Sequence, residues 1–369
     1  MTKKNRCACL RPFFNAEIYH NGDVFTCCSS YVKYPIGNIF RDSFEEIWNG
    51  SAAQTIRGQL LLGNQAACRT ELCHLADRSG KGVCGKNLTD KQLTALKTTM
   101  PYPKNVLFSY DDECNVRCMM CRRKRVRYSH NELAKLNSRI DYILPMLKNA
   151  TMVAPVGGEL FASRHSRLLV KQIIEKYPKI KFRISTNGLF ANETMFRELG
   201  LLYTDKNKRL KSRLHQVTVS LHATTKKTYQ KIVLGSNWEI VTQNLQWLSE
   251  LKQRQQMVNF IMVFVLSELN YRELPDFMDW AHNLGAWPVA WEYKNWGAQN
   301  EKQARELSIV NPLHRDYYEL VKVLKDKRVQ KCPDKNPFSP AIIKAIREPI
   351  RERTSDEITR SKRWHKCQS

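Results

Sequence analysis

The stretch "DDECNVRCMMCRRKRVR", residues 111–127, holds three cysteines within eight positions and follows them with five positive charges in six residues. Cys114, Cys118 and Cys121 have the spacing CxxxCxxC, which offers three thiolates from one loop to a four-iron cluster. The fourth iron of such a cluster has no protein ligand, so a substrate or cofactor can coordinate it. A zinc site or a chance grouping of thiols is the alternative interpretation.

Composition narrows the class of protein. The chain has 369 residues, 42% hydrophobic content and a formal net charge of +25 at pH 7. The apolar run at 260–266 is too short for a membrane span, and the first residues lack the apolar core of a signal peptide, so we expect a cytoplasmic protein without membrane segments. Ten of the twelve cysteines fall within the first 121 residues. Because cytoplasmic thiols stay reduced, we interpret these cysteines as metal ligands rather than as disulfide partners.

The pattern of apolar residues predicts an α/β fold. Short apolar runs alternate with helical patterns, and they occur at 105–110, 151–155, 180–185, 216–222, 258–266 and 287–293. Apolar positions between 133 and 147 share one helix face, and those between 238 and 248 share another, opened by a capping box from Ser236 to Glu239. Six strand–helix units in series predict a parallel sheet with right-handed crossovers, open or curled into a partial (β/α)6 TIM-like barrel.

The cysteine content and the pattern of apolar residues divide the chain into three regions. Residues 1–100 hold seven cysteines and many turn residues, as in a small domain organised by metal. Residues 101–306 carry the strand–helix units. Residues 307–369 form a basic, mainly helical extension.

Two short motifs follow the second and third expected strands. In "VGGEL", Gly157 and Gly158 let a ligand approach the backbone, and Glu159 offers a carboxylate to an ammonium group. In "ISTNG", Ser185 and Asn187 can bind hydroxyl groups. Each motif alone is also plain turn chemistry. Both motifs follow the ends of expected strands, and parallel barrels bind their ligands at this end of the strands.

Over residues 104–295 these motifs together resemble the radical SAM superfamily. The resemblance implies a cluster on the CxxxCxxC loop, whose unique iron binds the amino and carboxylate groups of S-adenosylmethionine (SAM). It implies Cys114, Cys118 and Cys121 as cluster ligands and, as residues that contact SAM, Gly157, Gly158, Glu159, Ser185, Asn187, Met120 and Ser220. The implied chemistry is reductive cleavage of SAM to a 5′-deoxyadenosyl radical, which takes a hydrogen atom from the substrate. The electron comes from an external donor such as flavodoxin or ferredoxin.

The N-terminal cysteines carry a second pattern. "CLRPFFNAEIYHNGDVFTC", with its expected hairpin at 21–27, is followed by "IGNIFRDSFEEIWNG" and "CRTELC". This resembles the SPASM or Twitch auxiliary-cluster domain, although such domains more often follow the barrel. The resemblance implies a second [4Fe–4S] cluster on Cys9, Cys27, Cys68 and Cys73. Cys84 is an alternative ligand, Cys7 and Cys28 are bystanders or alternates, and a structural zinc knuckle is the alternative site.

Several other residues have both a functional and a structural interpretation. His222 ends the fourth strand and either touches the cofactor or is a hydrogen-bonded structural histidine. Glu292 ends the sixth strand and either contacts substrate or forms a salt bridge. Cys332 and Cys367 are hydrogen-atom donors to a substrate radical or free thiols. The basic run at 122–127 lies at the barrel mouth or is a solvated helix start.

Three classes of function remain open. The first is a radical SAM enzyme that acts on a small anionic substrate, such as a nucleotide- or phosphate-linked sugar, by epimerisation, dehydration or dehydrogenation. The second is a radical SAM maturase of a peptide or protein. The third is an iron–sulfur protein that binds or modifies RNA, which the charge alone supports.

Overall fold

The six strands expected between residues 105 and 293 are all present. They are β4 (Asn105–Asp111), β6 (Met152–Gly157), β7 (Lys181–Thr186), β10 (Leu214–Ser220), β12 (Asn259–Leu266) and β13 (Trp287–Glu292). The pairings of β4 with β6, β6 with β7, β10 with β12 and β12 with β13 are all parallel. The prediction of an α/β fold with a large parallel sheet is therefore confirmed.

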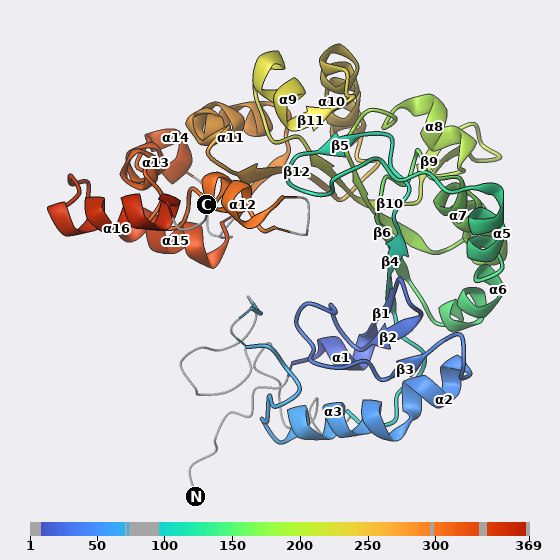
Figure 1. Cartoon of the computed structure of the whole chain (residues 1–369). Coiled ribbons are helices and arrows are strands. Elements are labelled where there is room, and N and C mark those ends of the chain that lie inside the picture. Colours follow the sequence, from blue (N-terminus) through green and yellow to red (C-terminus); the bar gives the residue numbers. More distant parts are fainter. Residues whose placement is uncertain (1–8, 71, 74–95, 296–298, 332–337, 367–369) are drawn as a thin grey trace, which may run out of the picture. The chain divides into compact units, whose positions relative to one another are not determined.

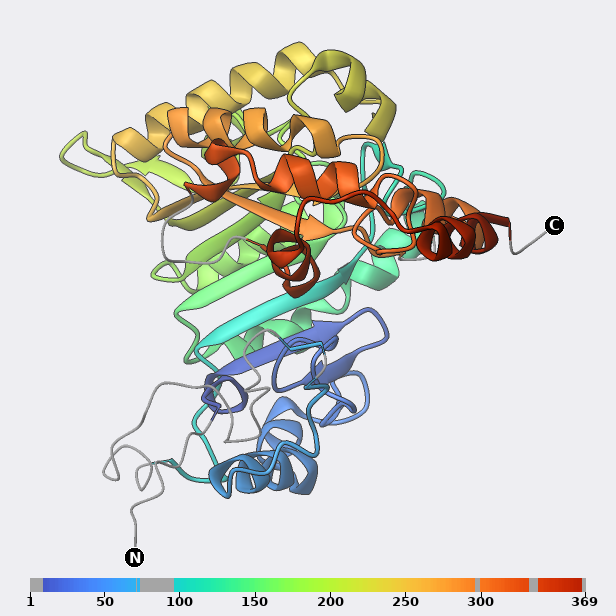
Figure 2. The same cartoon turned by 90° about the vertical axis from the view of Figure 1, so that its left-hand side faces the viewer.

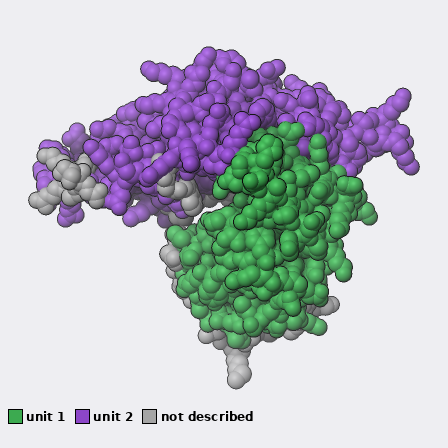
Figure 3. Space-filling view, turned by 45° about the vertical axis from the view of Figure 1, so that its right-hand side comes forward, with its two compact units in different colours: residues 1–113, 128–184 green, residues 114–127, 185–369 purple. Residues whose placement is uncertain are grey.

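The computed structural model describes residues 9–70, 72–73, 96–295, 299–331 and 338–366 (Figure 1). The chain forms two compact units, which have different colours in Figure 3. The first unit comprises residues 1–113 and 128–184, and the second comprises residues 114–127 and 185–369. The domain boundaries expected after residues 100 and 306 remain a prediction.

Three N-terminal strands extend the sheet of the first unit, in which the strand order is β7-β6-β4-β1-β2-β3. β1 (Asn15–Tyr19) runs parallel to β4, and β2 (Asp23–Phe25) returns antiparallel to β1 and pairs with β3 (Gly37–Asn38). Gly22 makes the return possible, because its φ of +89° is strained for other residues. The expected hairpin is thus confirmed, whereas the parallel pairing of β1 with β4 has no signature in the sequence.

Side chains alternate between two faces along the strands of the first unit. On β7, Phe182 and Ile184 are buried, while Lys181 and Arg183 are exposed. Three helices lie on one side of β4 and β6 in Figure 1: α5 (His130–Asn137), α6 (Ile140–Ile143) and α7 (Arg164–Lys176). The apolar face packs toward these helices, so the polar residues lie on the open face of the sheet.

The apolar residues between 133 and 147 do not form one helix. α5 ends at Asn137, and α6 and the 3₁₀ segment η1 (Leu144–Leu147) follow it. Pro145 stands at the start of η1, where a residue without an N–H group is tolerated, but it cannot continue an α-helical ladder. Ile143 and Leu147 are buried nonetheless. The apolar pattern is therefore right and the single helix face is wrong.

Arg57 connects the N-terminal helices of the first unit. It lies on α3 (Ser51–Leu61), and its side chain is fully buried. The guanidinium donates to the carbonyl oxygens of Pro12 (3.0 Å), Trp48 (2.8 Å) and Thr98 (2.8 Å). It also lies 4.3 Å from the centre of the Trp48 ring. Because a buried charge needs such partners, Arg57 ties α1 (Arg11–Phe14), α2 (Phe44–Asn49) and the segment before β4 to α3.

In the second unit, strands β10, β12 and β13 form a parallel array with helices along one side (Figures 1 and 2). Phe264 of β12 packs against Phe277, with 4.8 Å between the ring centroids. The helices on this side are α9 (Lys226–Ile232), α10 (Trp238–Gln253) and α11 (Leu274–Asn283). Ser220 points to the opposite face of β10 from the buried Val217 and Val219.

The capping box expected at the start of α10 is wrong by one residue. Asn237, not Ser236, caps the helix, and its side chain accepts a hydrogen bond from the N–H of Ile240. The Ser236 hydroxyl donates instead to the carbonyl oxygen of Val233, and Glu239 pairs with Lys226. Both residues of the expected box therefore have other partners.

The C-terminal region is helical, as the sequence predicts. After β13 come α12 (Glu301–Leu307), α13 (Tyr317–Leu324), α14 (Lys327–Gln330), α15 (Pro340–Arg347) and α16 (Ser355–Lys366). The second unit also contains α8 (Glu193–Glu198), the hairpin of β8 (Leu202–Thr204) and β9 (Leu210–Ser212), and the 3₁₀ turn η2 (Tyr271–Glu273). Within the described residues, no helix combines the length and apolar character that crossing a bilayer requires.

Candidate functional site

The cysteine loop of the second unit is held by its own backbone. The N–H of Cys114 donates to the carbonyl of Val126 (3.1 Å), and that of Cys121 donates to Cys118 (3.1 Å). Cys118 lies in β5 (Arg117–Cys118), which pairs antiparallel with β11 (Val233–Leu234). Cys121 is exposed, and the other two thiols are half-buried. Three accessible thiols on one loop fit a cluster that the protein ligates at three of its four irons.

The basic run beside this loop is partly structural. Arg125 donates through Nε to the carbonyl of Asn115 (2.6 Å), and Arg117 donates to the carbonyl of Arg123 (3.3 Å). Lys124 and Arg127 are exposed and form no ion pair with any residue that the structure describes. Within the run itself, Arg125 holds the loop, whereas Lys124 and Arg127 are exposed, so only part of the run is a solvated surface.

The Gly-Gly-Glu motif lies against the end of β4 in the first unit. The N–H of Gly158 donates to the carbonyl of Asp111 (2.6 Å), and that of Glu159 donates to the carbonyl of Glu113 (2.8 Å). A Cβ atom would come within 2.3 Å of the Asp111 oxygen at Gly157, where φ is +124°, and within 2.1 Å of the Glu113 oxygen at Gly158. The glycines thus permit backbone to approach backbone. The Glu159 side chain is buried, and its carboxylate accepts a hydrogen bond from the N–H of Phe161.

A buried polar network behind β4 has no signal in the sequence motifs. The Asp111 carboxylate accepts hydrogen bonds from the hydroxyls of Ser163 and Ser166, and Glu113 pairs with Arg164 at 3.0 Å. Buried His165 contacts the Tyr110 hydroxyl at 2.8 Å and the side-chain oxygen of Asn137 at 2.8 Å, and burial lowers its pKa to about 4. These residues fix the two carboxylates that precede Cys114 in the chain. Ser163 and Ser166 belong to the segment "SRHSR", which matches no motif of the sequence analysis.

Asn187 contacts the cysteine loop within the second unit. Its side-chain N–H group donates to the Asn115 side-chain oxygen (2.8 Å), and its own oxygen accepts from the N–H of Leu189 (3.1 Å). Ser185 is exposed and Ser220 is half-buried, so both hydroxyls are accessible, whereas Met120 is buried. The structure brings Asn187 to the loop, while the SAM contacts of these residues stay a prediction.

His222 has a structural environment. Its φ is +66°, its Nδ1 accepts a hydrogen bond from the N–H of Val265 (3.1 Å), and Asn270 donates to its carbonyl oxygen (2.8 Å). Burial lowers the pKa of His222 to about 4, so the imidazole is neutral near pH 7. These bonds join the ends of β10 and β12. A contact between His222 and the cofactor stays a prediction.

The remaining expected residues lie at or beyond the C-terminal strand. Glu292 has its Oε1 atom 3.6 Å from the Lys294 amine, while its buried Oε2 atom has no hydrogen-bond partner among the residues that the structure describes. Cys332 and Cys367, the expected hydrogen donors, lie outside the described residues. Cys7 and Cys84 lie outside them as well.

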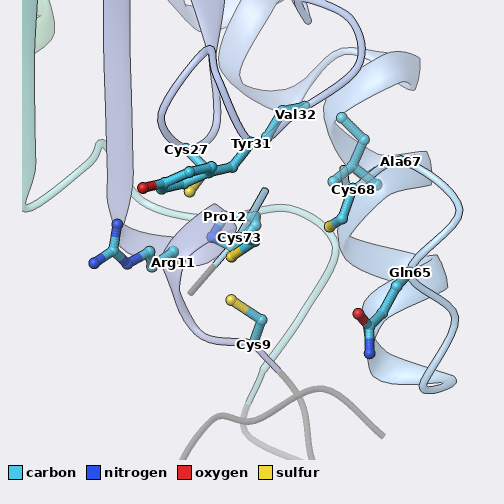
Figure 4. A pocket seen from close by; sticks show the side chains of 11 residues that line it. Cys9, Arg11, Pro12, Cys27, Tyr31, Val32, Gln65, Ala67, Cys68 and Cys73 are labelled. Carbon is cyan, nitrogen blue, oxygen red and sulfur yellow. The ribbon is translucent and has the colours of Figure 1, made fainter. Parts of the chain in front are cut away.

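The four expected auxiliary ligands line one cavity in the first unit (Figure 4). They are Cys9, Cys27, Cys68 and Cys73, and Arg11 and Tyr31 line the same cavity. Cys28 does not line it. An isolated bridge between Val32 and Cys68, with backbone bonds from Lys33 to Ala67 and from Arg69 to Tyr31, joins the segment after β2 to the later cysteines.

Two thiols of this cavity, those of Cys27 and Cys68, are protonated near pH 7 without metal. Burial raises the pKa of Cys27 to about 12 and that of Cys68 to about 11. A cluster therefore displaces protons as it forms. Across the described residues, no three cysteine, histidine or carboxylate side chains are grouped for one metal ion. A four-iron cluster spreads its ligands more widely because each thiolate binds a different iron, and four thiols around one cavity fit it.

Comparisons with known proteins agree with these two centres. Residues 111–281 match the model of the radical SAM superfamily, and residues 7–75 match that of the SPASM iron–sulfur cluster-binding domain. No curated protein matches the chain.

Solved structures show weaker similarity. SuiB of Streptococcus suis is 14% identical, with a TM-score of 0.41, over 64% of this chain and 49% of SuiB. SuiB bound to its precursor peptide SuiA is 13% identical, with a TM-score of 0.41, over 90% of this chain and 72% of that one. Methylornithine synthase (PylB) is 12% identical, with a TM-score of 0.37, over 60% and 61% of the two chains. This chain thus spans about half the length of the first SuiB structure. From the two domain matches, the chain belongs to the radical SAM superfamily and carries a SPASM domain, so it is an enzyme that uses SAM and [4Fe–4S] clusters.

Proposed function

We propose that this enzyme takes a hydrogen atom from a small anionic substrate, such as a nucleotide-linked or phosphate-linked sugar, for epimerisation, dehydration or dehydrogenation. When bound, the cluster and SAM supply the 5′-deoxyadenosyl radical that breaks the substrate C–H bond. An external one-electron donor such as flavodoxin or ferredoxin supplies the electron. The chain itself binds, orients and shields the reactants.

The observation that carries this proposal is the positive charge beside the cysteine loop. Lys124 and Arg127 follow the last loop cysteine by three and six positions, and both are exposed without an ion pair among the described residues. Nearby cations attract anionic ligands and stabilise thiolates. A substrate with a phosphate group gains from this charge, whereas a neutral one does not.

The roles of the loop and strand-end residues are part of the same proposal. Cys114, Cys118 and Cys121 ligate the first cluster, and Gly157, Gly158 and Glu159 hold the amino end of SAM. Ser185, Asn187 and Ser220 bind hydroxyl groups, and Met120 packs against adenine. The bond from Asn187 to Asn115 supports this assignment, because it orients the amide beside Cys114. Cys9, Cys27, Cys68 and Cys73 hold the auxiliary cluster.

The C-terminal arginines favour a small substrate over RNA. Arg351 pairs with Glu357 (2.7 Å), and Arg353 donates to the carbonyl oxygens of Pro312 (3.0 Å) and His314. The Trp364 ring packs edge-on against His314, with 6.3 Å between centroids. These side chains are engaged within the helical extension, so they do not form a stacking surface for bases.

Deuterium transfer tests the proposal. The anaerobically reconstituted enzyme, reduced and supplied with SAM, is incubated with perdeuterated nucleotide sugars, with a deuterated peptide pool, or with deuterated tRNA. We expect deuterium in 5′-deoxyadenosine only from an anionic sugar, detected by mass spectrometry. Transfer from peptide or tRNA alone would overturn the assignment of the substrate class.

A further inference from the structure

Arg164 joins the two ends of the cysteine loop. The chain leaves the first unit after Glu113 and returns to it at Tyr128. The Arg164 guanidinium pairs with the Glu113 carboxylate, with 3.0 Å between Nη2 and Oε1, and Nη2 also donates to the carbonyl oxygen of Tyr128. The Nε atom lies 3.3 Å from the same carboxylate oxygen. One side chain therefore binds the last residue before the loop and the first residue after it.

Tyr128 makes a second connection between these two ends. Its hydroxyl accepts a hydrogen bond from the N–H of Asp112 (2.7 Å), the residue before Glu113. The Glu113 side chain is only 6% exposed, whereas that of Arg164 is 36% exposed. An arginine that binds a buried carboxylate through several N–H donors has a defined geometry, unlike most ion pairs at the surface. The base of the loop is therefore held by side chains as well as by backbone.

Glu113 also binds the Gly-Gly-Glu motif within the first unit. Its carbonyl oxygen accepts a hydrogen bond from the N–H of Glu159 (2.8 Å), and the carbonyl of Asp111 accepts one from Gly158 (2.6 Å). A displacement of Glu113 therefore reaches Glu159 through one hydrogen bond and Cys114 through one peptide bond. Because Glu159 is a proposed SAM contact and Cys114 a proposed cluster ligand, both roles depend on the position of Glu113.

Capping of α7 explains only part of this arrangement. The first turn of α7 contains no acidic residue, and the Glu113 carboxylate accepts a hydrogen bond from the backbone N–H of Arg164 (3.0 Å). A carboxylate is stabilising there, because the N-terminus of a helix carries partial positive charge. This bond needs no particular side chain at position 164. The guanidinium adds the bonds to Tyr128 and the paired bonds to Glu113, which capping does not require.

We propose that Arg164 is a positioning residue for SAM, which acts by holding both ends of the cysteine loop where the Gly-Gly-Glu motif is anchored. The inference rests on the roles proposed for the loop and for Glu159. Arg164 acts through Glu113 and Tyr128. A guanidinium suits this task, because its planar fork presents donors to two acceptors at once, whereas a lysine amine is a point charge.

SAM binding to the cluster-loaded enzyme tests this role, with isothermal titration calorimetry as the measurement and no substrate present. We expect Arg164→Gln to weaken SAM binding by about tenfold, because residues that orient a metal site typically contribute about 10–100-fold. Arg164→Lys should recover only part of the loss, since an amine keeps the charge but not the fork. Iron should stay at about eight per chain, because all the cysteines remain.

Spectroscopy separates positioning from folding. SAM should change the electron paramagnetic resonance spectrum of the reduced enzyme, because it binds the iron that the loop leaves without a thiolate. In Arg164→Gln, the same change should need about tenfold more SAM. A residue that only stabilises the fold would instead lower the thermal midpoint of unfolding and the iron content, and SAM binding per cluster would stay the same.

Arg197→Gln is the matched control. Arg197 of α8 also pairs with a glutamate, Glu193 (2.7 Å), and both side chains are exposed. This variant should bind SAM as the unaltered enzyme does. The positioning role is wrong if Arg164→Gln binds SAM as tightly as Arg197→Gln, or if its SAM binding falls only in proportion to lost iron.

Separate outcomes distinguish this inference from the proposed function. The titration contains no substrate, so a wrong substrate class leaves its result unchanged. Glu159→Gln tests the SAM contact itself, because it keeps the backbone bond to Glu113. If Arg164→Gln weakens SAM binding and Glu159→Gln does not, the positioning role stands and the role proposed for Glu159 fails. If only Glu159→Gln weakens binding, the role of Glu159 stands and the positioning role fails.

Discussion

The chain builds its two cysteine sites in opposite ways. The loop site takes three thiols from eight consecutive residues, and its backbone bonds to Val126 and to β11 lie within one unit. The auxiliary site takes four thiols from residues 9 to 73, and strand pairing and α3 bring them to one cavity. The loop site is local, whereas the auxiliary site is assembled from distant residues and includes one buried thiol, that of Cys27.

This difference shows what each site depends on. To hold its cluster, the loop needs only the backbone hydrogen bonds of its own turn and its short strand pairing, so it tolerates changes elsewhere in the chain. The auxiliary cavity needs the N-terminal fold, because Cys9 and Cys73 come from opposite ends of that region. Damage to the N-terminal fold should therefore remove the auxiliary cluster and spare the loop cluster.

Replacing Cys114, Cys118 and Cys121 together with alanine should have the largest effect. We expect 5′-deoxyadenosine formation to fall to the background, and iron to drop from about eight to about four per chain. The remaining iron should belong to the auxiliary site. Product is measured by liquid chromatography and iron by colorimetric assay. Residual SAM cleavage in this variant would show that the loop is not the radical centre.

Adjacent cysteines at the auxiliary site offer a sharper contrast. Cys27 is buried and lines the cavity, whereas Cys28 is next to it in sequence and does not line it. We expect Cys27→Ala to lose about four of eight irons and Cys28→Ala to keep all of them. Mössbauer spectroscopy counts the clusters directly. The reverse result would exchange the ligand assignment of the two residues.

Sequence patterns predicted cysteine ligands for both sites, but only the local site is encoded by neighbouring residues. The CxxxCxxC spacing and six apolar runs identify the loop and the strands, because both are encoded by neighbouring residues. The parallel pairing of β1 with β4 joins residues that are far apart in the sequence, so no local pattern near Asn15 predicts it. The same holds for Arg57, which is fully buried, because no local pattern predicts the three carbonyl oxygens that it binds.

The strand-end glycines show a different limit. Gly157 and Gly158 were predicted from ligand approach, but their Cβ positions are blocked by the carbonyls of Asp111 and Glu113. A glycine motif thus predicts that something approaches the backbone closely. It does not predict whether that partner is a ligand or another part of the chain. The network of Asp111 with Ser163 and Ser166 is missed for a related reason, since serines after a strand carry no unique pattern.

Arg57→Met tests whether the auxiliary site depends on the N-terminal fold. Methionine is similar in length but donates no hydrogen bond, so three buried carbonyl oxygens lose their donor. We expect a loss of about 3 kcal/mol in the free energy of unfolding of the first unit. Urea denaturation followed by tryptophan fluorescence measures it, since Trp48 packs against Arg57.

The iron content of Arg57→Met tests whether the two cysteine sites are built independently. It should lose auxiliary iron and retain the loop cluster. Arg69→Met serves as the control, because Arg69 is less buried and donates to one carbonyl, that of Ser29. Equal loss from both clusters in Arg57→Met would show that the two sites are not built independently.

Asn115→Ala should have the smallest effect and bears on the local site alone. It removes the oxygen that holds the Asn187 amide at 2.8 Å, but it leaves the Asn115 carbonyl that Arg125 binds. Because residues that orient a metal site typically contribute 10–100-fold, we expect SAM cleavage to fall about tenfold, with a raised KM for SAM and unchanged iron. Asn207→Ala, in the exposed β8–β9 turn, should change neither quantity. If Asn115→Ala lowers the iron content instead of raising KM, the asparagine supports the cluster itself, and the local loop depends on more than its own backbone.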